Sequence, residues 1–216
     1  MARSHALSRP RDTKSLSRKP PQKVPGSITL IVCEGKTEET YFGMVCRHYR
    51  LPTATVVVAR ASTKSAPIRV VQHAKDKNDE DGGYDKVFCV FDRDDHESFD
   101  RALGEIKKLA SRKRKPIPIV GVISIPCFEV WLLLHFEKTS APFGRCDDVI
   151  KHLNAYIGYK KAHLDSHTPS ELMARLEEAL NNAAWLEENT ASNGRNPFTR
   201  IHEVLLHLRS AATECR

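Results

Sequence analysis

Three acidic side chains follow directly on apolar segments of the sequence. Glu34 comes after ITLIVC (28–33), and Asp92 and Asp94 come after KVFCVF (86–91). Carboxylates that lie close together repel one another unless a cation stands between them. Mg²⁺ prefers oxygen ligands of this kind and keeps positions for water and phosphate. The residue types therefore indicate a divalent metal site, with Mg²⁺ or Mn²⁺ as the cofactor.

The elements that would position these acids alternate between strand and helix. Uninterrupted apolar segments predict four strands, and the segments between them predict helices; the strands are 28–33, 54–60, 86–91 and 117–123, and the helices are 37–50, 67–77 and 98–112. This alternation is typical of an α/β fold with a mostly parallel sheet covered on both faces. Ligands bind at the carboxyl ends of such strands, where the strand order reverses. If the first and third strands are neighbours, the three acids converge there.

Four nearby residues are secondary candidates. Lys36, at the start of the first helix, and Arg93, between two aspartates, are placed to bind a phosphate. Glu38 lies in the first turn of that helix, where negative charge is favoured whether or not it binds a metal. Glu129 is expected in the first turn of a later helix. It either caps that turn or reaches the metal from the end of the fourth strand.

The charge is concentrated at the N-terminus. Residues 1–26 hold seven Lys/Arg and one acid of a chain whose net charge is +7. With their prolines and serines, they predict a disordered tail. The tail is either an arm that binds nucleic acid through phosphates or a solubilising extension. Residues 27–125 are expected to form the α/β core, and 126–216 a helical part packed on it.

The C-terminal part shows helical patterns alone. The predicted helices are 127–136, 146–157, 169–188 and 197–212, and no strand is predicted after Pro126. His135 lies on the apolar first of these helices. We expect it to be a buried histidine with satisfied hydrogen bonds rather than a metal ligand.

Several classes of protein are disfavoured. No segment approaches the roughly 18 apolar residues of a membrane span, and the basic N-terminus lacks the apolar region of a signal peptide. No GxxxxGK[ST] phosphate-binding loop occurs. Cys33, Cys89 and Cys127 lie in or beside apolar segments, where free cysteine behaves as a small apolar residue, so we expect no disulfides. The six cysteines include no CxxC pair, so we expect no structural zinc site. The cytoplasm is the expected compartment.

The motifs resemble a known family. A Glu-Gly after the first strand and an Asp-x-Asp after the third resemble the signature of TOPRIM domains, named after topoisomerases and primases. Three blocks, VCEGKTEETYF (32–42), SIPCFEVWLLLHF (124–136) and NPFTRIHEVLLHL (196–208), resemble the RloB-like family of bacterial proteins. The chain departs from that family's usual pattern at Ile125, where Asn is usual.

The resemblance implies a TOPRIM-like or Rossmann-like fold and a nuclease activity. It implies Mg²⁺-dependent phosphodiester chemistry on nucleic acid, in bacterial anti-phage or restriction-associated systems, with an ATPase as a possible partner protein. Glu34 would be the general base or the first metal ligand. Asp92 and Asp94 would hold one or two metal ions. Hydrolysis is favoured over strand transfer.

Two other functions stay open at this point. The chain could be a non-catalytic nucleic-acid-binding or regulatory subunit of a defence complex. It could also be a phosphotransferase of the haloacid-dehalogenase type, which places Asp-x-Asp after a strand. That second alternative fits less well, because His96 stands where those enzymes have Thr or Val and Glu34 would have no role. The sequence distinguishes neither DNA from RNA nor one oligomeric state from another.

Overall fold

A computed structural model describes most of the chain beyond its N-terminal tail. The described residues are 27–59, 66–93, 97–159, 168–190 and 196–214. The tail predicted at residues 1–26 and the candidate site residue Asp94 lie outside them. Within the described ranges, no helix combines the length and the apolar character that crossing a bilayer requires.

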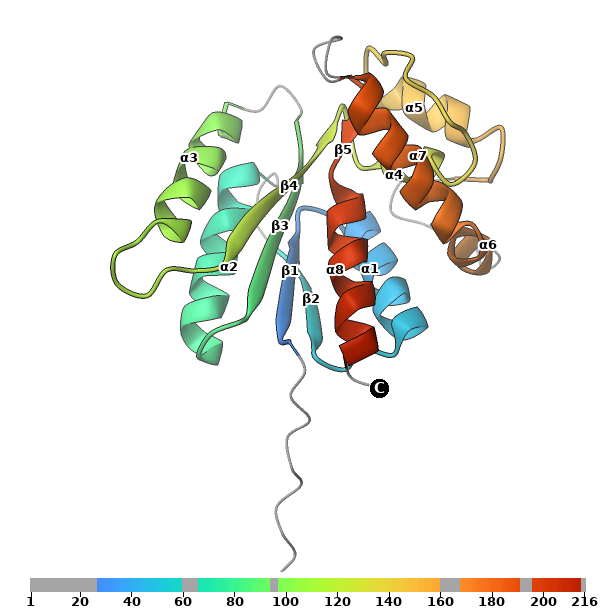
Figure 1. The fold of residues 1–216 in the computed structure, drawn as a ribbon. Coiled ribbons are helices and arrows are strands. Elements are labelled where there is room, and N and C mark those ends of the chain that lie inside the picture. The colour runs from blue at the N-terminus through green and yellow to red at the C-terminus, as the bar shows by residue number, and fades with distance from the viewer. Residues whose placement is uncertain (1–26, 60–65, 94–96, 160–167, 191–195, 215–216) are drawn as a thin grey trace, which may run out of the picture.

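The described residues form one sheet with helices on both sides (Figure 1). The elements are β1 (Thr29–Cys33), α1 (Lys36–Tyr49), β2 (Ala54–Val58), α2 (Pro67–Asp81), β3 (Lys86–Asp92), α3 (Phe99–Ala110), β4 (Ile119–Ile125), α4 (Glu129–Leu133), α5 (Cys146–Leu153), α6 (Thr168–Ala174), α7 (Leu176–Asn189), β5 (Phe198–Thr199) and α8 (Ile201–Glu214). The strand order is β2-β1-β3-β4-β5. The expected neighbourhood of the first and third strands is confirmed.

The sheet has five strands, so the prediction of four was wrong. The first four are parallel, and β5 pairs antiparallel with the end of β4. The sequence pattern predicts a single helix over residues 197–212. A strand of two residues is too short to show a period of two, and only its pairing with Ser124 and Ile125 of β4 reveals it.

The strands bury both faces because their side chains alternate between two apolar layers. Ile31, Phe88 and Val90 belong to the core beneath α1 and α8. Leu30 and Val87 face the second core, beneath α2 and α3. Figure 1 shows the two helix pairs on opposite sides of the sheet. Burial on both faces explains why the sequence shows unbroken apolar segments at these strands.

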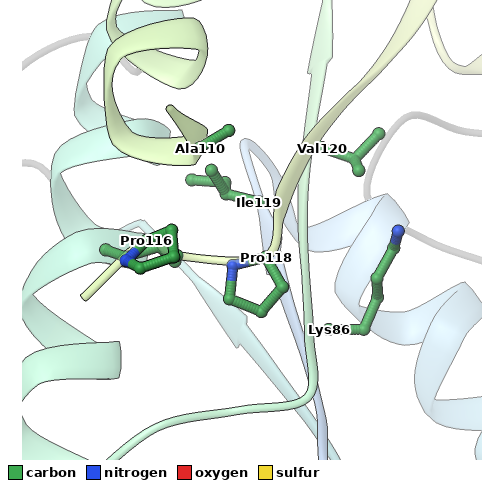
Figure 2. Close-up of a pocket in the computed structure, with 7 residues that line it drawn as sticks. Lys86, Ala110, Pro116, Pro118, Ile119 and Val120 are labelled. Carbon is green, nitrogen blue, oxygen red and sulfur yellow. The ribbon is translucent and has the colours of Figure 1, made fainter. Parts of the chain in front are cut away.

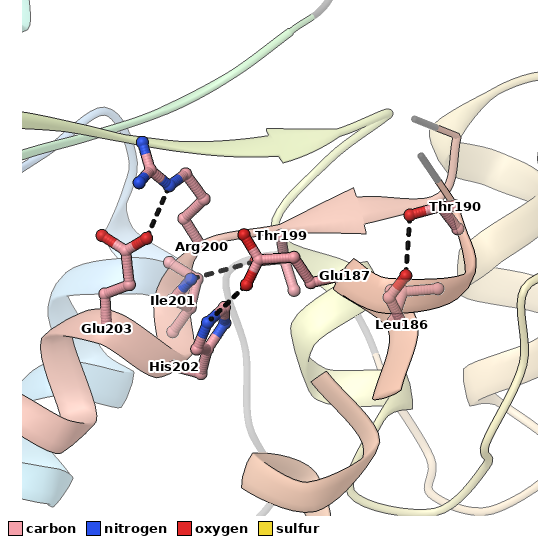
Figure 3. Close-up of polar contacts among 8 residues, drawn as sticks. All are labelled: Leu186, Glu187, Thr190, Thr199, Arg200, Ile201, His202 and Glu203. Atoms are coloured by element: carbon pink, nitrogen blue, oxygen red, sulfur yellow. Dashed lines mark hydrogen bonds and ion pairs between the residues drawn. The ribbon is translucent and has the colours of Figure 1, made fainter. Parts of the chain in front are cut away.

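The C-terminal helices differ in length from the expected ones. The helix expected at 127–136 is reduced to α4, Glu129–Leu133, and the one expected at 169–188 is divided into α6 and α7 at Arg175. Contacts at the start of α8 tie it to its neighbours, as Figure 3 shows. His202 Nε2 lies 3.4 Å from Glu187 Oε2 of α7. The Ile201 N–H donates to Thr199 Oγ1 at 3.3 Å.

His135 has the buried role that we expected. It is fully buried, its Nε2 lies 3.2 Å from the Tyr41 hydroxyl, and its Nδ1 lies 3.0 Å from the Trp131 carbonyl oxygen. Burial lowers the pKa of His135 to about 4. A neutral histidine with both ring nitrogens occupied is a structural residue of the core.

Two glycines test how closely α3 lies over the sheet. A Cβ on Gly104 of α3 would have no atom within 4 Å, whereas one on Gly121 of β4 would lie 3.1 Å from Ile106 Cδ1. Gly104→Ala should therefore stabilise the protein by about 0.5–1 kcal/mol through helix propensity. Gly121→Ala should destabilise it by about 1 kcal/mol through crowding. Urea denaturation of both variants checks the prediction, and equal effects would contradict it.

Candidate metal-binding site

The carboxyl edge of the sheet brings Glu34 and Asp92 together. The Glu34 N–H donates to the Val90 carbonyl oxygen at 3.1 Å, which places Glu34 beside the end of β3. The Asp92 N–H in turn donates to Glu34 Oε2 at 3.3 Å. Glu34 therefore contacts β3 through both its backbone and its side chain. These two hydrogen bonds hold its carboxylate beside the backbone of Asp92, at the end of β3.

Three further carboxylates, those of Glu38, Glu129 and Glu34, act electrostatically on Asp92 at this edge. Asp92 is half-buried, and the pKa of its carboxyl group is raised well above the usual value. Burial is the largest cause, followed by the negative charges of Glu38, Glu129 and Glu34, while a hydrogen bond from the Phe128 backbone opposes them. The metal-free site is therefore electrostatically strained. A divalent cation would relieve the repulsion and use the carboxylates as hard oxygen ligands.

Gly35 makes room for one of these acids. It is the N-cap of α1, and its extended backbone suits any residue. A Cβ there would lie only 2.8 Å from Glu38 Oε2. The absence of a side chain at position 35 thus lets the Glu38 carboxylate fold back against the turn between β1 and α1. Glu38 itself is buried, which is unusual for an acid that merely favours a helix N-terminus.

This contact gives a direct test. In Gly35→Ala, the new methyl group should displace the Glu38 carboxylate and weaken Mn²⁺ binding roughly 10-fold, as changes beside metal ligands commonly do. Stability should change little, because the displaced group is the end of a flexible side chain. Gly43→Ala in the same helix is the matched control, since its Cβ would meet Arg47 Nη1 at 3.5 Å. Equal Mn²⁺ affinity in the two variants would contradict the role of Glu38.

Glu129 reaches the site from α4. It is 2% exposed, and its Oε1 accepts a hydrogen bond from the Tyr159 hydroxyl at 2.6 Å. The Tyr159 N–H donates to Asn154 Oδ1 at 2.8 Å, which fixes the loop after α5. Burial and the neighbouring Glu129 charge raise the pKa of Tyr159, so the hydroxyl keeps its proton. Sequence patterns do not predict the role of Tyr159, because it lies in a loop without a motif.

A disulfide lies beside Glu129 and corrects our expectation of free cysteines. Cys127 and Cys146 are bonded, with their Cα atoms 5.6 Å apart. Cys127 lies two residues before α4 and Cys146 is the first residue of α5, and these two helices pack against each other. Their separation of 19 residues carries no recognisable spacing, so only the folded arrangement reveals the pair. Cys33, Cys46 and Cys89 are free and buried, as expected for small apolar side chains.

The two basic candidates lie at the outside of the site. Lys36 is paired with Glu39 in the first turn of α1. The exposed guanidinium of Arg93 lies over the Phe99 ring, 5.6 Å from its centroid. Neither is drawn into the carboxylate cluster. Asp94 lies outside the described residues, so its placement relative to Asp92 stays a prediction.

Strands β4 and β5 support the edge from one side. Asp92 is level with Ser124 of β4, and the Arg93 N–H donates to the Ser124 carbonyl oxygen at 2.8 Å. The Ser124 hydroxyl lies 3.0 Å from Thr199 Oγ1 of β5, and both residues are buried. This chain of contacts holds the end of β3, and with it Asp92, against two further strands.

A hollow elsewhere on the sheet lacks this chemistry. It has a volume of about 300 Å³ and lies at the amino end of β4, opposite the carboxylates; its lining residues are Lys86, Ala110, Pro116, Ile117, Pro118, Ile119 and Val120. Figure 2 shows Lys86 beside two prolines there. Lys86 is the single ionisable residue of this lining. The hollow offers no group of ligands for a metal.

The comparisons with known proteins agree with the arrangement of the motifs. The family model for RloB-like proteins matches residues 29–208. The chain belongs to the RloB-like family. No curated protein and no solved structure matches it. The RloB-like match spans every described carboxylate of the cluster, from Glu34 on β1 to Glu129 on α4, so the site lies wholly within the family's shared region.

Proposed function

We propose that this RloB-like chain is a Mg²⁺- or Mn²⁺-dependent phosphodiesterase that cleaves nucleic acid. The observation that carries the proposal is the contact of Glu34 with Asp92 at the edge of the sheet, where burial and the charges of Glu38, Glu129 and Glu34 raise the pKa of Asp92. Proteins retain such unfavourable clusters at functional sites, where perturbed pKa values gather. An oxygen-only ligand set matches Mg²⁺ and Mn²⁺.

Metal binding, proton transfer and phosphate contact fall to different residues of the site. Asp92, Glu38 and Asp94 would hold the cation through their carboxylate oxygens. Glu34, fixed by the Asp92 N–H, is placed to accept a proton from an attacking water or to act as a further ligand. When bound, the metal supplies Lewis acidity and neutralises charge on the phosphate. Lys36 and Arg93 extend from the rim, where each can contact a flanking phosphate after leaving its present partner.

The fold supports the same proposal. The acids follow the first and third strands of a mostly parallel sheet, the positions that a TOPRIM-like core would use. The basic residues at 1–26 would bind the nucleic-acid backbone without regard to sequence. A role in bacterial anti-phage defence, with an ATPase as partner, belongs to the proposal and depends on the family resemblance alone.

Cleavage assays test the proposal. The purified full chain is incubated with plasmid DNA, single-stranded DNA and a transfer-RNA pool in Mg²⁺, Mn²⁺ or EDTA, beside Asp92→Asn. We expect cleavage of at least one substrate that requires the metal and is lost in the variant. Metal-independent cleavage, or equal cleavage by the variant, would refute the assignment. Binding of these nucleic acids without cleavage would favour the regulatory-subunit alternative.

A further inference from the structure

A second group of ligand atoms adjoins the carboxylate cluster. One ligand atom each of Cys127, Glu129 and Cys146 lies within 4.8 Å of the others. Cys127 and Glu129 are buried, whereas Cys146 is half-buried and accessible to solvent. The group therefore combines two sulfur atoms with one carboxylate at the junction of α4 and α5. That composition differs from the oxygen-only set at the end of β3.

The disulfide leaves Glu129 Oε2 facing a sulfur atom that cannot donate a hydrogen bond to it. Cys146 Sγ lies 3.2 Å from Glu129 Oε2. While it is bonded to Cys127, this sulfur has no hydrogen to donate. A buried carboxylate is stable when a donor or a cation faces it. The contact thus points to a second state of the cysteine pair, in which a thiol proton or a metal ion faces the carboxylate.

We propose that in the reduced protein Cys127, Cys146 and Glu129 bind a thiophilic divalent cation such as Zn²⁺. Zn²⁺ accepts both thiolate and carboxylate ligands, and a water from the exposed side of Cys146 would complete a four-coordinate set. In a tetrahedral site with these bond lengths, neighbouring ligand atoms stand about 3.5–3.8 Å apart. The present 3.2 Å contact between Cys146 Sγ and Glu129 Oε2 therefore needs only a small adjustment.

Reduction of the Cys127–Cys146 disulfide converts one state into the other. A dithiol or phosphine reductant supplies two electrons that break the Cys127–Cys146 bond, and each sulfur takes up one proton. The dithiol becomes a disulfide, or the phosphine becomes its oxide with oxygen from water. Binding of the cation then releases both thiol protons to solvent, because thiolates are the ligands. Oxidation removes two of the three ligands, so the site exists only in the reduced protein.

Tyr159 acts as a positioning residue for this site. Its hydroxyl donates to Glu129 Oε1 at 2.6 Å, on the opposite oxygen from the sulfur contact. Such a bond orients a ligating carboxylate, and its loss commonly weakens metal binding 10- to 100-fold. The proposal shares Glu129 with the carboxylate cluster, but its test is separate from the nuclease assays, because the readout comes from sulfur ligands that Mg²⁺ does not favour.

The test is metal titration of the full chain. Protein freed of metal and reduced with a phosphine is titrated with Co²⁺, whose thiolate complexes absorb in the near ultraviolet, and Zn²⁺ is then added as competitor. By thiolate absorption we expect one equivalent of Co²⁺, displaced by Zn²⁺ and unaffected by excess Mg²⁺. Oxidised protein should show no thiolate absorption with Co²⁺, and this arm needs no substitution. Tyr159→Phe should weaken binding at least 10-fold.

Cysteine variants complete the design. Cys146→Ala should abolish the thiolate absorption, whereas Cys46→Ala, in α1 and outside the group, should leave it unchanged. The proposal is overturned if reduced wild-type protein shows no thiolate absorption with Co²⁺. It is overturned equally if oxidised protein or Cys146→Ala shows the same thiolate absorption as the reduced wild type.

Discussion

Asp92→Asn should make the metal-free protein more stable, by on the order of 1–2 kcal/mol at pH 8. The substitution removes a charge that burial and the carboxylates of Glu38, Glu129 and Glu34 disfavour. Asn has nearly the same shape and keeps an oxygen to accept the hydrogen bond from the Phe128 backbone. A change of this size shifts Tm by a few degrees in a protein of this length.

The difference in stability between wild type and Asp92→Asn should depend on pH. Because the folded-state pKa of Asp92 is raised, the folded protein retains a proton that the unfolded chain releases above about pH 4. Wild-type stability is therefore lost, relative to the variant, as pH rises from there through the folded-state pKa. Denaturation curves in EDTA at pH 5 and pH 8 measure the effect. A variant that is less stable than wild type at pH 8 would contradict it.

Mg²⁺ should reverse the order of stability. A ligand at 100 times its Kd adds about 2.7 kcal/mol to the folded state that binds it. We expect this gain in wild type and little of it in Asp92→Asn. The residue would then be costly for folding and necessary for binding, as is common where function opposes stability.

Glu34→Gln should lower the rate of metal-dependent cleavage by roughly 10²–10⁴-fold, the range for loss of a general base. Gln retains an oxygen that can accept the hydrogen bond from the Asp92 N–H, so the edge of the sheet should keep its structure. The variant should fold normally and still bind nucleic acid. Single-turnover cleavage, with binding measured separately, distinguishes lost chemistry from lost affinity.

Glu39→Gln is the matched control for this variant. Glu39 lies five residues further along and pairs with Lys36 at the rim instead of joining the cluster. Its loss should change the cleavage rate by no more than about twofold, since exposed ion pairs contribute little. If both variants lose activity equally, general disturbance of the first turn of α1 explains the loss, and the special role of Glu34 is refuted.

Most of the sheet could be predicted from the sequence, because a strand that is buried on both faces appears as an unbroken apolar segment. The unbroken apolar segments before Glu34 and Asp92 correspond to β1 and β3, and their expected adjacency is what the structure has. Strand β5 could not be predicted, since its two residues depend on pairing with the end of β4. The division between α6 and α7 likewise left no proline or glycine as a signal.

The candidate site was predicted in part for a similar reason. Glu34 and Asp92 are tied to strand ends, which sequence patterns locate well. Glu129 could be named only as an alternative, because its approach to Asp92 depends on how α4 packs. Tyr159 and the Cys127–Cys146 pair depend on contacts between segments distant in sequence, whose partners are separated by 30 and 19 positions. No local pattern encodes such contacts.

The central claim is that the carboxylates at the sheet edge form one divalent metal site, and Mn²⁺ binding followed by electron paramagnetic resonance tests it most directly. The account predicts stoichiometric binding to wild type, displacement by Mg²⁺, and a loss of at least 10-fold in affinity in Asp92→Asn, although that variant is the more stable protein. Absence of binding to wild type, or unchanged affinity in the variant, would contradict it.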